Sequence, residues 1–85
     1  MHERSLMRAL VRQIITIAQE HQAERVRKVV VRAGALGHDP GGHLQEHFRR
    51  EARGTLLEGA ALEIVRAEEL IDLALDSVEL DLPEA

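Results

Sequence analysis

The first three residues hold the nitrogen atoms that are best placed to bind a metal ion. The chain begins Met1-His2-Glu3, so an α-amine, an imidazole and backbone amides lie within a single chelating bite. The Met1 amine and the His2 amide close a five-membered ring with a bound metal, and the His2 amide and its own Nδ1 close a six-membered ring. Nitrogen sets of this kind suit the square-planar geometry of Cu(II) and Ni(II). If the protein binds a metal, these first residues are therefore the leading candidates, although a histidine can also follow the initiator methionine by chance.

Three further histidines are weaker candidates for metal ligands. His43 and His47 stand four residues apart in a segment expected to be helical, where two imidazoles can share one ion. His38 precedes that helix and could add a ligand or approach the amino terminus. Two imidazoles alone make a weak site, so surface or core-edge positions are the favoured interpretation for His43 and His47. The absence of cysteine excludes a thiolate zinc site and a disulfide.

The acidic side chains of the carboxyl-terminal third do not indicate catalysis. The set comprises Glu68, Glu69, Asp72 and Asp76, and a solvated hairpin turn with an outer strand face accounts for it better than paired catalytic carboxylates. The chain has no Ser-His-Asp order, glycine-rich phosphate loop or metalloprotease helix motif. We therefore expect a protein that is not an enzyme.

Charge is distributed unevenly along the chain. Residues 1–57 carry ten basic and six acidic side chains, whereas residues 58–85 carry one and nine. We expect the two sets to neighbour each other in the fold or to pair between subunits. Nucleic acid is an improbable partner because the only aromatic residue, Phe48, provides no stacking platform. The cluster Arg49, Arg50 and Arg53 complements a helix dipole, with a docking patch for an acidic partner as the alternative.

The elements that position these residues can be predicted from apolar spacing. A helix is expected from Ser5 to about Gln22. A β-branched strand follows over residues 26–33. A second helix is expected from Pro40 to Arg53, capped by Asp39. The residues expected to face inward from the two helices are Leu6, Leu10, Ile14, Ile17, Ala18, Leu44, Phe48 and Ala52.

Two alternating stretches complete the chain. Residues 60–66 place Leu62 and Ile64 on one face, after a turn bracketed by Gly54 and Gly59. Apolar residues then switch parity between residues 71–75 and 78–82, which requires a bulge or kink near Asp76-Ser77. The predicted order α-β-α-β-β gives an α+β fold of two layers, in which two helices cover one face of a three-stranded sheet. We expect residues 1–85 to form a single domain.

The apolar runs are too short to cross a bilayer, and the amino terminus lacks a signal-peptide core. We therefore expect a soluble, cytoplasmic protein with no membrane contact.

Several short motifs together resemble a known family. They are Met1-His2-Glu3-Arg4-Ser5-Leu6; Val26 to Gly34 followed by Leu36; Leu44 to Phe48; Gly54-Thr55-Leu56-Leu57-Glu58-Gly59-Ala60 with Leu62-Glu63-Ile64; and Leu73-Ala74-Leu75-Asp76-Ser77-Val78-Glu79-Leu80. Their order and spacing resemble the HypA/HybF family, nickel metallochaperones that supply nickel to nickel–iron hydrogenase and in some organisms to urease.

The resemblance implies which atoms bind nickel and which proteins receive it. The ligands would be the Met1 amine, the amide and imidazole of His2, and the amide of Glu3. The partners would be a maturation GTPase or a nickel-enzyme precursor. The amine has a reference pKa of about 7.7 to 8.0 and must lose its proton, so affinity should rise with pH. Cu(II) should outcompete Ni(II) at these ligands, so selectivity would depend on metal supply or on a partner.

The chain departs from the family pattern in one respect. Family members carry a zinc-binding insertion with two Cys-x-x-Cys pairs between the second and third strands. Here residues 65–72 form a short connector without cysteine. We therefore expect a HypA-like nickel-binding domain over residues 1–85 that lacks the insertion and its structural zinc.

Loss of that insertion leaves a second functional hypothesis open. The chain could be a non-metal interaction or assembly scaffold that retains the fold. On either hypothesis it could form a homo-oligomer, because its sheet has exposable edges and its core is lean in aromatic residues.

Overall fold

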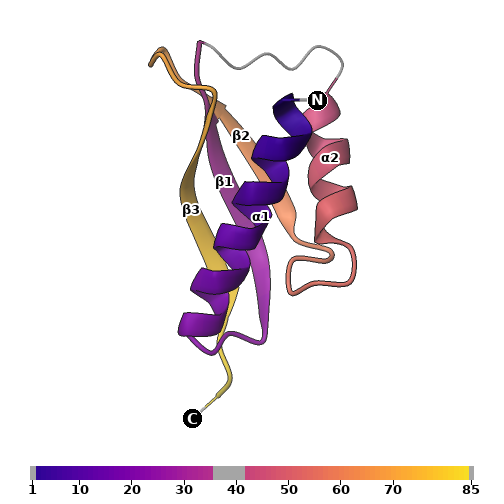
Figure 1. The fold of residues 1–85 in the computed structure, drawn as a ribbon. Coiled ribbons are helices and arrows are strands. Elements are labelled where there is room, and N and C mark those ends of the chain that lie inside the picture. Colours follow the sequence, from indigo (N-terminus) through magenta and orange to yellow (C-terminus); the bar gives the residue numbers. More distant parts are fainter. Residues whose placement is uncertain (1, 36–41, 85) are drawn as a thin grey trace.

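Two helices lie on one face of a three-stranded sheet (Figure 1). The computed structural model describes residues 2–35 and 42–84, and of residues 2–4 only the backbone. The elements are α1 (His2–Glu20), β1 (Arg25–Ala33), α2 (His43–Ala52), β2 (Ala61–Arg66) and β3 (Leu73–Asp81). The predicted α+β class and the order α-β-α-β-β are confirmed. Neither helix in the described ranges combines the length and apolar character that a membrane span requires.

The strands are arranged in the order β2-β1-β3, with β1 in the centre. β1 pairs with β2 in parallel and with β3 antiparallel. The expected hairpin between the last two strands is therefore wrong. Residues 67–72 instead cross the carboxyl end of β1, a span of two strand spacings, or roughly 10 Å. A connector of this length can make that crossing as easily as it can form a hairpin, so its length alone does not decide strand order.

Three backbone hydrogen bonds hold this crossing connector to the end of β1. Ala67 N donates to Ala33 O at 2.9 Å, Gly34 N to Asp72 O at 3.2 Å, and Ala35 N to Glu69 O at 2.8 Å. Gly34 lies directly beneath the connector. A Cβ at this position would stand 2.6 Å from the Glu69 carbonyl oxygen and would also collide with the side chain and carbonyl of Ile71. Glycine is needed here because the two backbone segments approach so closely.

Each of the paired strands β3 and β1 contains one register shift. Val30 faces Ser77 and Val31 faces Leu75, so Asp76 is the extra residue. This confirms the bulge predicted from the change of parity. The second shift leaves Arg27 unopposed on β1 and was not predicted. It brings both Val26 and the alternate residues Val29, Val31 and Ala33 to the helix-covered face.

The core forms between this sheet face and the two helices. α1 contributes Met7, Leu10, Val11, Ile14 and Ala18, all buried. Leu6 and Ile17, which were expected to face inward, are only half-buried, and Met7 and Val11 take more of the interior. α1 contacts both α2 and β3, so its apolar stripe is wider than a stripe that serves a single neighbour.

The second helix is shorter than expected. It begins at His43 and not at Pro40, because Gly42 precedes it in the left-handed region with φ 75°. Asp39, the expected cap, lies outside the described residues, as does Pro40. Leu44, Phe48 and Ala52 are buried as predicted. The turn after α2 also agrees with expectation, since Gly54 and Gly59 both adopt positive φ and enclose the buried Leu57.

Basic side chains of β1 pair with acidic side chains that flank them. Lys28 Nζ lies 2.9 Å from Glu63 Oε1 of β2, and Arg32 pairs with Glu69 of the connector. Arg25 and Arg27 both bind the Asp81 carboxylate of β3, at 2.7 and 2.5 Å. The predicted proximity of basic and acidic segments within one fold is thereby confirmed. The hydrogen bond from Arg25 is the main cause that lowers the pKa of Asp81, and the bond from Arg27 adds to it.

Replacing Asp81 by asparagine should weaken the protein in a pH-dependent way. A carboxyl group whose pKa is lowered by folding stabilises the native state above its unfolded pKa of about 3.9. That stabilisation is lost as pH falls through the folded value. The difference in urea midpoint between wild type and Asp81→Asn should therefore be constant from neutral pH to about pH 5 and shrink below about pH 4. Glu84→Gln, which removes the same charge from an exposed side chain beyond β3, should show no such difference. A difference in urea midpoint between wild type and Asp81→Asn that persists below about pH 4 would show that the ionised Asp81 carboxylate is not what stabilises the fold.

Candidate metal centre at the amino terminus

The start of α1 presents the backbone groups that the predicted metal site requires. The helix begins at His2, so the amides of His2 and Glu3 belong to its first turn. The first four N–H groups of an α-helix have no acceptor within the helix. These two amides can therefore bind a metal without breaking an intrahelical hydrogen bond. Met1 lies outside the described residues, and the side chains of His2 and Glu3 are likewise not described.

The electrostatics of a helix start are compatible with such a complex. A helix amino terminus carries a partial positive charge, which by itself opposes a bound cation. Two deprotonated amides, a neutral amine and a neutral imidazole bring two negative charges to a divalent ion. The resulting complex has no net charge, and the same positive helix end favours the deprotonated amides. The donor set at Met1-His2-Glu3 therefore fits a divalent ion at this position.

The second helix begins at the same end of the protein. α1 and α2 run side by side in the same direction (Figure 1), and Arg8 Nε of α1 lies 3.5 Å from Glu51 Oε1 of α2. Arg8 is six residues after His2 and Glu51 is eight after His43. With a rise of about 1.5 Å per residue, His43 lies close to the level of His2 along the helix axes. The fold thus brings one weaker candidate towards the predicted metal site.

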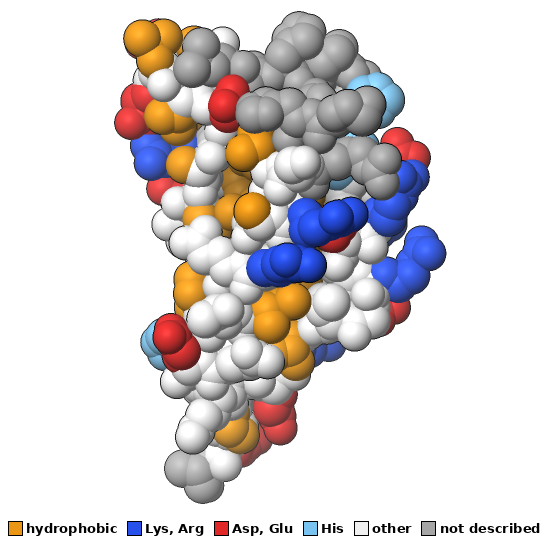
Figure 2. Space-filling view, in the orientation of Figure 1, with side chains coloured by type: hydrophobic (Ala, Val, Ile, Leu, Met, Phe, Trp, Pro, Cys, Tyr) orange, Lys and Arg blue, Asp and Glu red, His pale blue; other side chains and the backbone are white. Residues whose placement is uncertain are grey.

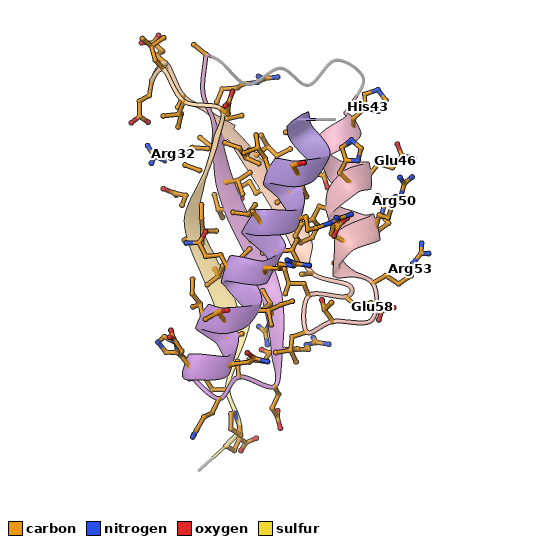
Figure 3. The ribbon with its side chains drawn as sticks, viewed as in Figure 1. Arg32, His43, Glu46, Arg50, Arg53 and Glu58 are labelled. Carbon is orange, nitrogen blue, oxygen red and sulfur yellow. The ribbon has the colours of Figure 1, made fainter. Side chains whose placement is uncertain are left out.

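The two described candidate histidines neighbour each other but do not form a complete site. The rings of His43 and His47 have centroids 6.3 Å apart and are tilted by 32°. His43 is exposed and His47 half-buried, as the surface or core-edge interpretation predicted. Glu46 Oε2 lies 3.9 Å from His43 Nδ1 and borders His43 on the outer side of α2 (Figure 3). His38 lies outside the described residues.

No cluster of three metal-ligating side chains occurs within residues 5–35 and 42–84. Glu46 is a neighbour of His43 that the sequence interpretation missed, although its spacing of three residues from His43 on a helix could have revealed it.

Three members of the acidic set near the connector, Glu69, Asp72 and Asp76, make contacts that stabilise the fold. Glu69 pairs with Arg32, and Asp76 Oδ1 lies 3.6 Å from Arg32 Nε. Asp72 accepts the Gly34 amide through its backbone carbonyl. These contacts tie the connector and the β3 bulge to the central strand, and the carboxylates of Glu69 and Asp76 both face Arg32.

Comparison with known proteins places these features in a family. The family model described as "Hydrogenase/urease nickel incorporation, metallochaperone, hypA" matches residues 1–72. Hydrogenase maturation factor HypA of Archaeoglobus fulgidus is 42% identical over 64 residues, which cover 75% of this chain and 58% of that protein. HypA of Nitrosospira multiformis is 40% identical over 67 residues, covering 79% and 58%. The chain therefore spans little more than half the length of the curated relatives it matches.

A solved structure shares the fold. The solution structure of the Ni metallochaperone HypA from Helicobacter pylori superposes with a TM-score of 0.76 and 17% identity, covering 95% of this chain and 98% of that chain. At this identity the likeness concerns the fold alone.

Proposed function

The chain belongs to the HypA family, and from that membership we propose that it is a metallochaperone-like accessory protein that binds Ni(II) at its amino terminus for delivery to a nickel enzyme. The observation that carries the proposal is the start of α1 at His2, which leaves the amides of His2 and Glu3 free for a metal. The family description names nickel incorporation and metallochaperones. The relatives' names specify hydrogenase maturation, so a hydrogenase precursor is the proposed acceptor.

Delivery requires a site that releases its ion as readily as it binds it. A chelate at the end of the chain is exposed, and its affinity is reduced by the protons that the amine and amides must lose. The protein itself would carry out no chemical reaction on its cargo. We propose that it works in the cytoplasm with a maturation GTPase or with the nickel-enzyme precursor, and that it binds neither nucleic acid nor membrane. We also propose that it self-associates through a free edge of its sheet.

We further propose that residues 1–85 act as one HypA-like nickel-binding domain without structural zinc. Support comes from the crossing connector, residues 67–72, which joins β2 to β3 directly over the end of β1. The connector occupies the place where the family resemblance predicts a zinc-binding insertion. The sequence supplies no cysteine for such an insertion.

A titration of the chain with its native amino terminus tests the proposal. Adding Ni(II) near pH 8 should produce the visible d–d absorption band of square-planar nickel, saturating at one equivalent. The band should weaken as pH falls below about 7.7, because the amine then retains its proton. A saturating titration that leaves the spectrum unchanged would reject nickel binding. The alternative function, a scaffold that works without metal, would then be preferred.

A further inference from the structure

A groove lies between the second half of α2 and the beginning of β2, at the opposite end of α2 from the candidate metal centre. Its volume is about 640 Å³. Phe48, Ala52, Leu57 and Leu62 contribute apolar atoms to it, and Arg49 and Arg53 also line it. The groove therefore combines an apolar floor with basic side chains.

The free edge of β2 forms one wall of this groove. β2 is an outer strand, bonded only to β1 among the strands of the described sheet. Gln45 Nε2 of α2 donates to Leu62 O at 2.8 Å, so the Leu62 carbonyl points away from β1. Backbone groups alternate along a strand, so the N–H and C=O of Ile64 face the same way. This edge offers hydrogen bonds to a further strand, and the Gln45 side chain covers part of it.

The arginines that line the groove are available to a ligand. Arg49 and Arg53 are exposed, and neither forms an ion pair with any side chain in the described ranges. Glu58 also lines the groove, where its Oε1 accepts the Gly54 amide at 3.0 Å, so with Arg49 and Arg53 the charged lining residues sum to a net positive charge. Figure 3 shows Arg53 projecting outward beside Glu58, and basic side chains gather along the α2 side of the molecule in Figure 2.

We propose that this groove binds an extended acidic segment of a partner protein as an additional strand on the edge of β2. The partner backbone would pair with Leu62 and Ile64, displacing the Gln45 side chain. Side chains of one parity would enter the groove, where a small apolar residue fits against Phe48. A carboxylate two residues further along the segment would reach Arg49 or Arg53. Charge complementarity selects the acidic partner, because the two guanidinium groups of Arg49 and Arg53 outweigh the single carboxylate of Glu58 in the groove.

This interaction surface is independent of nickel, so it can be tested on the metal-free chain. The probe is a short fluorescent peptide in which threonine alternates with valine and glutamate, followed by anisotropy. We expect saturable binding and shifts of the Leu62 and Ile64 amide resonances in heteronuclear NMR spectra. A peptide with lysine in place of glutamate should bind at least roughly tenfold more weakly. Failure of the acidic peptide to bind at millimolar concentration would overturn the proposal.

Charge-matched variants separate the groove from general electrostatic attraction. Arg49→Glu with Arg53→Glu should weaken peptide binding by roughly tenfold or more. Arg12→Glu with Arg50→Glu makes the same change in net charge at exposed positions outside the groove and should change binding less than about twofold. Equal losses in the two double variants would contradict a specific site. Far-UV circular dichroism establishes that both variants are folded.

Methylation of the peptide backbone tests whether the ligand binds as a strand. N-methyl groups on alternate residues remove the hydrogen-bond donors of one edge only. Two peptides are compared, one methylated at the odd-numbered residues and one at the even-numbered residues. One of them should fail to bind and the other should bind normally, because a β-strand pairs with its neighbour through alternate residues. Equal binding of the two methylated peptides would show that only side chains are recognised, and would overturn the proposed pairing.

Discussion

Replacing His2 by alanine should abolish the square-planar nickel band. The change removes the imidazole and with it the six-membered chelate ring, leaving an amine and amides that cannot hold nickel near neutral pH without that anchor. We expect apparent affinity to fall by at least about 100-fold, more than is typical for the loss of an outer-shell partner. Absorption spectroscopy and a competing chelator measure the loss. His47→Ala serves as the matched control, because it removes an imidazole from α2 while leaving the amino terminus intact.

An extended amino terminus gives a second, independent form of this prediction. Two additional residues before Met1 move the free amine out of the chelating bite but leave His2 in place, so the band should also disappear. A single added residue is not an equivalent variant. It would make the histidine the third residue and create a new set of amine, two amides and imidazole, which also suits Ni(II). An unchanged band in His2→Ala or in the chain extended by two residues would show that nickel binds elsewhere.

Replacing Gly34 by alanine should destabilise the fold severely. The added methyl group would meet the Glu69 carbonyl and Ile71 of the crossing connector. The connector would have to lift, which endangers the bonds from Gly34 N to Asp72 O and from Ala35 N to Glu69 O. Overpacking and the loss of these backbone hydrogen bonds together should cost about 3 kcal/mol of unfolding free energy. Urea denaturation followed by circular dichroism measures this change.

Gly54→Ala is the control for the Gly34 prediction. Both variants change the unfolded chain in the same way, because each replaces one glycine by alanine. No atom lies within 4 Å of a Cβ built on Gly54, although its φ of 77° is unfavourable for alanine. The expected loss is therefore about 1 kcal/mol, from the left-handed conformation alone. A loss at Gly34 no larger than that at Gly54 would mean that the connector is not packed against β1.

Element types could be predicted from the sequence because apolar spacing reports them locally. The bulge at Asp76 was predictable, since the apolar residues of β3 change parity on either side of it. The shift at Arg27 was not, because the consecutive valines of β1 place apolar residues on both faces and conceal any change of parity. Strand order also escaped prediction. A connection such as residues 67–72 can reach either the neighbouring strand or the strand beyond it, and only the packing of Gly34 beneath the connector reveals the crossing.

The candidate metal site was accessible to sequence reasoning for a different reason. Its donors are contiguous in the chain, so the chelate rings formed by Met1 and His2 follow from covalent geometry and need no tertiary contact. The groove beside β2 had no comparable signature. Its arginines were visible as a cluster, but the free strand edge and the Gln45 contact with Leu62 arise from residues distant in sequence.

Because α1 and β1 run in opposite directions (Figure 1), the amino end of α1 lies beside the carboxyl end of β1, where an acceptor of the proposed nickel ion would have to approach. The amino end of α1, the carboxyl end of β1 and the crossing connector all lie at one pole of an elongated body whose longest dimension is 42 Å (Figure 1). A longer connector would add residues around the end of the protein from which nickel is proposed to depart, whereas the connector of residues 67–72 is short and adds few there. On the proposed function, the length of this one connection sets how much of the nickel ion's surroundings this chain lines and how much is left for the acceptor protein to enclose.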